Sequence, residues 1–88
     1  MKPLEQSVQL LLLQDLGDRL HREQNWYSAV VIGLGDIPHL RIVGCPVEVV
    51  AATGTFDIWG MAPEGELIEG GFSQDGIVSR LVELYAKG

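Results

Sequence analysis

The chain has 88 residues, of which 47% are hydrophobic and 20% charged, a balance typical of one folded domain and unlike that of a disordered segment. Its formal net charge is −6 and its six basic residues are scattered, which argues against nucleic acid and anionic membranes as partners. The single cysteine, Cys45, cannot form an internal disulfide, and no apolar run suits a signal peptide or a membrane span. We therefore expect residues 1–88 to form a single soluble domain in the cytoplasm.

An amphipathic helix is predicted over residues 4–24. Large apolar residues recur at four-residue spacing, from Leu4 through Leu12 to Leu20, and define an unusually wide apolar face. Gly17 interrupts this face and weakens the helix by up to about 1 kcal/mol relative to alanine.

β-Branched and aromatic residues follow, in runs that turn residues separate. We expect strands at 26–34, 40–43, 47–52 and 55–61, and the short connections between them predict an antiparallel meander. Residues 62–71 contain one proline and three glycines, so they are predicted to form a loop or a short edge strand blunted by charge, which leaves a fifth strand at 66–69 open.

A second helix is predicted near the C-terminus, with Ser73 or Asp75 as its N-cap and an apolar face that includes Ile77 and Leu81. The order is then α-β-β-β-β-α. This order predicts an α+β two-layer sandwich in which a four-stranded antiparallel meander carries both helices on one face.

The glycines of the segment VVIGLGDIP, at positions 33 and 35, raise the question of a phosphate-binding loop. The dinucleotide fingerprint needs a third glycine where this chain has Pro38, and a helix where it has a strand-like run. The chain also lacks any lysine between Lys2 and Lys87, so a Walker-type loop is excluded. The two glycines are therefore predicted to be turn residues.

No catalytic, metal or cofactor site is predicted. Asp36, His39 and Cys45 are close in sequence, but an extended strand would separate His39 from Cys45 by about 20 Å. Two isolated histidines and one cysteine do not match a zinc site. The three acidic residues Glu64, Glu66 and Glu69 are interpreted as a solvated edge.

Alternation along the predicted strands defines two faces of the sheet. The face expected beneath the helices carries Tyr27, Ala29, Val31, Leu40, Ile42, Val47, Val49, Phe56 and Ile58. The opposite face carries Val30, Ile32, Arg41, Val43, Glu48, Val50, Asp57, Trp59 and Met61. Charges interrupt this second face, yet it is too apolar to be plainly solvated, and no further segment remains to cover it.

Three interpretations of this second face stay open: an ordinary half-polar surface, a homodimer or partner interface, and a small-molecule site. The sequence favours a non-enzymatic protein-interaction module of an adaptor, chaperone-like or immunity-like kind, homodimeric through this face. The interaction residues are then Val43, Val50, Trp59 and Met61. The alternative is a small-molecule-binding domain or small enzyme with a pocket near Trp26, Asp57 and Trp59.

Overall fold

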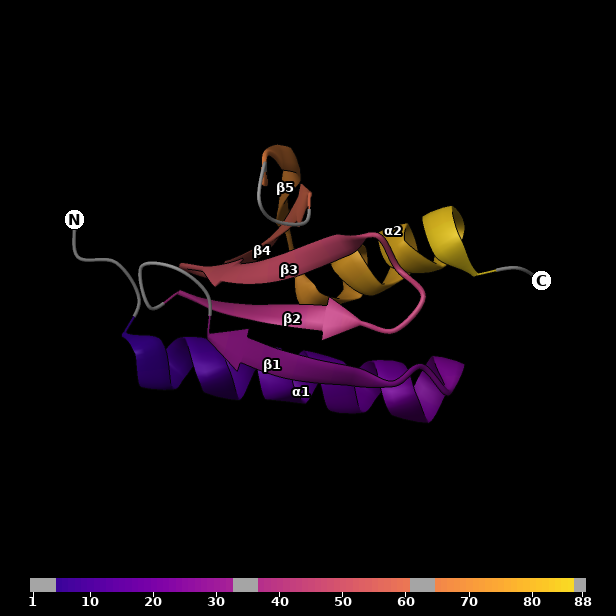
Figure 1. Ribbon diagram of the computed structural model, residues 1–88, viewed down its shortest axis with the longest axis horizontal. Helices are drawn as coiled ribbons and strands as arrows, with labels where there is room; N and C mark the ends of the chain where they lie inside the picture. The colour runs from indigo at the N-terminus through magenta and orange to yellow at the C-terminus, as the bar shows by residue number, and fades with distance from the viewer. Residues whose placement is uncertain (1–4, 33–36, 61–64, 87–88) are drawn as a thin grey trace.

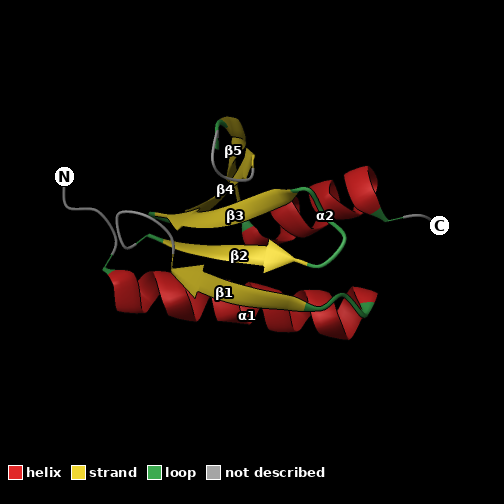
Figure 2. Ribbon diagram, in the orientation of Figure 1, coloured by secondary structure: helices red, strands yellow, loops and turns green. Residues whose placement is uncertain are grey.

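The computed structural model describes residues 5–32, 37–60 and 65–86, which form two helices and one sheet (Figures 1 and 2). In chain order the elements are α1 (Gln6–Gln24), β1 (Ser28–Ile32), β2 (Pro38–Ile42), β3 (Val47–Ala52), β4 (Thr55–Gly60), β5 (Leu67–Phe72) and α2 (Gln74–Tyr85). Each strand pairs antiparallel with its neighbour in the chain, so the sheet order is β1-β2-β3-β4-β5. The predicted α+β sandwich with an antiparallel meander is confirmed.

The predicted number of strands was wrong, because the sheet has five strands and not four. β5 lies in the segment left open between loop and edge strand, and it pairs with β4 through a shifted register. Gly71 adopts a left-handed φ of 82°, which L-residues rarely take. The resulting bulge breaks the period-two alternation by which a strand is recognised, and this explains why β5 was not assigned with certainty. Figure 1 shows β5 at the far edge of the sheet from β1.

Both helices cover the same face of the sheet, and the core lies between the two layers. α1 packs against β1, β2 and β3, while α2 packs against β4 and β5. The buried apolar side chains are Leu13, Leu16, Leu20, Leu40, Ile42, Val47, Val49, Ala51, Phe56, Ile58, Ile77, Val78 and Leu81. The opposite face, which we call the open face, carries no helix among the described residues (Figure 2).

The two faces of β1 are the reverse of those predicted. Ser28 pairs with Ile42 and Val30 with Leu40, so these residues point toward the helices. Tyr27 is 64% exposed and not buried beneath α1. Four consecutive apolar residues, 29–32, contain no alternation from which the phase of the strand could be determined, and the pairing with β2 decides it instead.

Polar contacts at the start of α2 join the two helices. The Ser73 hydroxyl accepts a hydrogen bond from the Gly76 N–H at 3.0 Å, which confirms Ser73 as the N-cap. Arg19 of α1 donates to the Gln74 side chain at 3.1 Å and pairs with Asp75 at 2.5 Å. These contacts hold the exposed sides of α1 and α2 together above the core.

Candidate functional site

One row of side chains crosses the whole open face. Cross-strand pairing places Ala29 beside Arg41, Arg41 beside Glu48, Glu48 beside Trp59, and Trp59 beside Leu67. His39 lies two residues before Arg41 on β2 and therefore on the same face. The open face thus has charged groups at its centre and apolar groups at its margins.

Glu48 is the buried charge of this face, and two basic side chains of β2 contact it. Its side chain is 5% exposed, and its Oε1 accepts a hydrogen bond from Arg41 Nε at 3.0 Å. His39 Nδ1 lies 2.9 Å from Oε2, although the angles are not those of a hydrogen bond. This second contact is therefore an ion pair whenever the imidazole is protonated, and both carboxylate oxygens have a basic neighbour. We call Glu48, Arg41 and His39 the charge cluster.

The charge cluster was not recognised as a unit from the sequence, but a signal for it exists there. Arg41 and Glu48 stand at equal distances from the turn formed by residues 43–46, in which Gly44 has a φ of 87°. Such a turn places two residues at equal distances from it opposite each other in the ladder. Opposite charges at these two positions predict a cross-strand ion pair.

The predicted interaction residues have different environments. Val43 is 74% exposed and follows the end of β2, where its N–H donates to the Tyr27 carbonyl at 2.8 Å. Val50 and Trp59 are partly buried, and the indole Nε1 of Trp59 is buried without a hydrogen-bond partner among the described residues. Met61 lies outside the described residues. Leu67, which the sequence did not single out, is 54% exposed at the end of the row.

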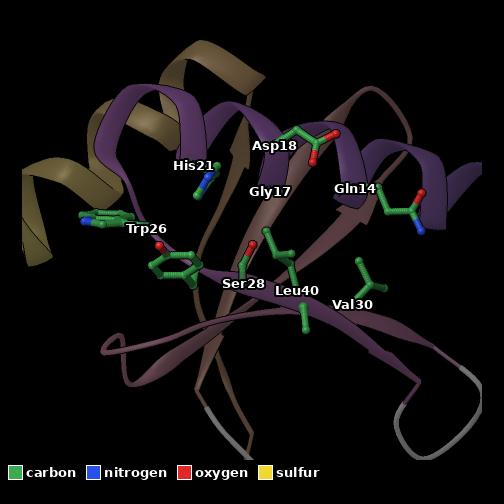
Figure 3. Close-up of a pocket in the computed structure, with 10 residues that line it drawn as sticks. Gln14, Gly17, Asp18, His21, Trp26, Ser28, Val30 and Leu40 are labelled. Carbon is green, nitrogen blue, oxygen red and sulfur yellow. The ribbon is translucent and has the colours of Figure 1, made fainter.

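A cleft of roughly 370 Å³ lies between α1 and β1, on the other side of the sheet from the charge cluster. Figure 3 shows Gln14, Gly17, Asp18 and His21 on α1, with the segment from Trp26 to Val30 opposite them. Leu40, which is 1% exposed, also lines the cleft. An alanine Cβ at Gly17 would lie 2.8 Å from Ser28 Oγ, so glycine at this position allows the close approach of α1 to β1.

The three residues of the alternative pocket, Trp26, Asp57 and Trp59, do not all line the cleft beside α1. Trp26 lines the cleft beside α1, whereas Asp57 and Trp59 do not. Asp57 Oδ1 instead accepts a hydrogen bond from the Gly71 N–H at 2.9 Å. This contact fixes the bulge of β5 against β4, which gives Asp57 a structural role.

The remaining candidate residues have local structural roles. Cys45 lies in the turn after β2, its N–H donates to the Ile42 carbonyl at 3.1 Å, and burial raises the pKa of its thiol. Glu69 pairs with Arg80 of α2, and these hydrogen bonds lower the pKa of its carboxyl. No three His, Cys, Asp or Glu side chains of residues 5–32, 37–60 and 65–86 are arranged to hold a metal ion. Gly33 and Gly35, which raised the question of a phosphate-binding loop, and Asp36 lie outside these ranges.

Comparisons with protein-family models, with curated proteins and with solved structures find no match for this chain. Neither helix in the part of the chain that the structure describes is long and apolar enough to cross a membrane.

Proposed function

We propose that this chain is a non-enzymatic protein-interaction module that binds a second copy of itself through the open face of its sheet. One observation carries the proposal: a buried, paired carboxylate lies at the centre of a sheet face that no described helix covers, with exposed apolar side chains at its margins. Apolar groups on such a face supply binding free energy, whereas fixed charges set register and orientation.

The burial of Glu48 supports an interaction role over a catalytic one. A catalytic carboxylate must reach its substrate, whereas Glu48 is 4% exposed and each of its oxygens already has a basic neighbour. Buried ion pairs are weak sources of stability, and their best-attested use is to specify one geometry among alternatives. We therefore interpret the charge cluster as the part of the interface that fixes its orientation.

The outward side of the cluster suits a symmetric contact. The Arg41 side chain is 48% exposed, and its hydrogen bond to Glu48 uses Nε, so its terminal nitrogens can donate hydrogen bonds to a carboxylate of the second copy. Val43 lies two residues after Arg41 on the same face, and Leu67 lies at the β5 end of the row, and both side chains are exposed. A twofold axis through the face would bury both apolar groups and pair both arginines.

Light scattering across a range of protein concentrations tests the proposal. The proposal predicts a molar mass near twice 9.6 kDa. Val43→Asp and Leu67→Asp, which change exposed residues, should each weaken association at least about tenfold. Leu11→Asp is the matched control, because Leu11 is 66% exposed on α1, away from the open face. A strict monomer, or equal weakening by all three substitutions, would contradict the proposal.

A further inference from the structure

The two edges of the sheet differ in how well they resist pairing with another strand. β5 carries Glu69, two glycines and shifted register, all features that blunt an edge. β1, the other edge, reads Ser-Ala-Val-Val-Ile, with no charge, no proline and no residue at positive φ. β1 is therefore the edge at which the described sheet can be extended.

The backbone groups available at the β1 edge follow from its pairing with β2. The Tyr27 carbonyl accepts from the Val43 N–H at 2.8 Å, so Tyr27 points its backbone groups inward, toward β2. Antiparallel pairs alternate between hydrogen-bonded and non-hydrogen-bonded, and hence the N–H and C=O groups of Ser28, Val30 and Ile32 point outward. Three residues at two-residue spacing thus present donors and acceptors for an added strand.

The cleft lies directly beside this edge. α1 forms one wall, β1 forms the other, and Leu40 and Gly17 line the space between them (Figure 3). A strand added to β1 would point every second side chain toward the helix layer, into this cleft. Main-chain pairing along an edge, combined with a side-chain pocket beside it, is a recurring mode of peptide recognition.

The charge of the cleft indicates which side chain it accepts. Asp18 lines the cleft, is exposed, and makes no hydrogen bond or ion pair with any described residue. Asp18 and His21 line both the cleft and a neighbouring hollow, whereas Arg22 and Asp15 line only the hollow. The protein as a whole carries a formal charge of −6. A cationic side chain therefore complements the cleft better than an anionic one does.

A second copy of β1 fits this edge less well than a peptide does. On the side of the helices β1 offers Ser28, Val30 and Ile32, all of them uncharged, so a second β1 would bring no cation to Asp18. Antiparallel pairing of two β1 strands would also bring the Asp18 carboxylates of both copies to the same interface. β1 has no basic side chain to pair with them, so the two negative charges would repel each other.

We propose that the β1 edge binds an extended segment of a partner protein by strand addition, with a lysine or arginine of that segment in the cleft beside Asp18. This site uses neither the charge cluster nor the exposed apolar side chains of the open face. The two proposals are therefore independent, and each can fail without the other.

The test uses two capped hexapeptides, one alternating lysine with valine and the other alternating glutamate with valine, titrated into the ¹⁵N-labelled full chain to about 1 mM. With the lysine peptide we expect amide shifts at Ser28, Val30 and Ile32 and along the cleft side of α1, and no such shifts with the glutamate peptide. Asp18→Asn should weaken binding of the lysine peptide about two- to fivefold, more at low salt than at high salt. Glu66→Gln, an exposed charge change near β5, is the matched control and should leave the affinity unchanged.

Ile32→Pro tests the edge itself, because it removes the outward backbone N–H of a residue that is 46% exposed. This variant should abolish the shifts, whereas Ile32→Ala should retain them. Shifts confined to the open face, equal binding of both peptides, or no shifts at the highest concentration would each overturn the proposal. Concentration-dependent shifts of the β1 amides without peptide, lost in Ile32→Pro, would assign the edge to a second copy and overturn it as well. The wild-type map decides the location even if the proline variant does not fold.

Discussion

Arg41→Met is the substitution that tests the charge cluster most sharply. It removes the hydrogen bond from Arg41 Nε to Glu48 Oε1, 3.0 Å long, and leaves a carboxylate that is 5% exposed, with His39 as its one basic neighbour among the described residues. A hydrogen bond to a charged group contributes about 1.5–3 kcal/mol. Because the Arg41 side chain is 48% exposed and water can replace part of the interaction, we expect a loss of about 1–2 kcal/mol in the free energy of unfolding.

Urea denaturation at one fixed protein concentration measures this loss, with an unchanged m-value as the sign that only stability has changed. In thermal unfolding the same loss corresponds to a Tm lower by about 4–16 °C for a domain of this size. Combining Arg41→Met with Glu48→Leu should return the stability to within about 1 kcal/mol of wild type, because the second change removes the stranded charge.

Arg22→Met is the matched control, since Arg22 is exposed and has no hydrogen bond or ion pair with a described residue. It should change stability by less than about 0.5 kcal/mol. An Arg41→Met variant as stable as this control would refute the interpretation of the charge cluster, and so would a double variant less stable than Arg41→Met alone.

Three further predictions follow from local contacts. Gly17→Ala should lower the Tm, because the new Cβ would lie 2.8 Å from Ser28 Oγ. Adding Ser28→Ala removes this clash and should restore or raise the Tm, because alanine favours the helix over glycine by up to about 1 kcal/mol. Ser73→Ala should cost about 1 kcal/mol in urea denaturation through loss of the α2 cap, whereas Ser73→Asp should retain most of the stability. Arg80 lowers the pKa of Glu69, so this pair stabilises the fold above the unfolded pKa of a glutamate and stops doing so as the pH falls. Glu69→Gln should therefore flatten the acid limb of a curve of stability against pH. An unchanged acid limb would contradict the pairing.

Much of the fold could be predicted because hydrophobic periodicity and turn residues determine it locally. The leucine spacing predicted α1, and β3 has the predicted bounds, Val47–Ala52. The Ser73 cap was one of two predicted alternatives and is confirmed. These features depend on side chains within one or two turns of each other, which a sequence shows directly.

The features that were missed or wrong depend on pairing between segments. β5 contains a bulge, so pairing with β4 determines that it is a strand. The apolar run of β1 has no alternation, so pairing with β2 determines which of its side chains face the helices. The interaction residues were chosen by type, yet burial separates them: Val43 is exposed, whereas the indole nitrogen of Trp59 is buried. The cleft could not be predicted, because it depends on how closely α1 approaches β1 at Gly17.

Self-association through the open face is the central claim, and nuclear Overhauser effects between copies test it most directly. In a sample that mixes ¹³C,¹⁵N-labelled with unlabelled chains, an isotope-filtered experiment detects only contacts between two copies. The account predicts such contacts from the methyl groups of Val43 and Leu67, and their loss in Val43→Asp. Contacts that arise instead from α1 or from the β1 edge, or the absence of any at millimolar concentration, would contradict it.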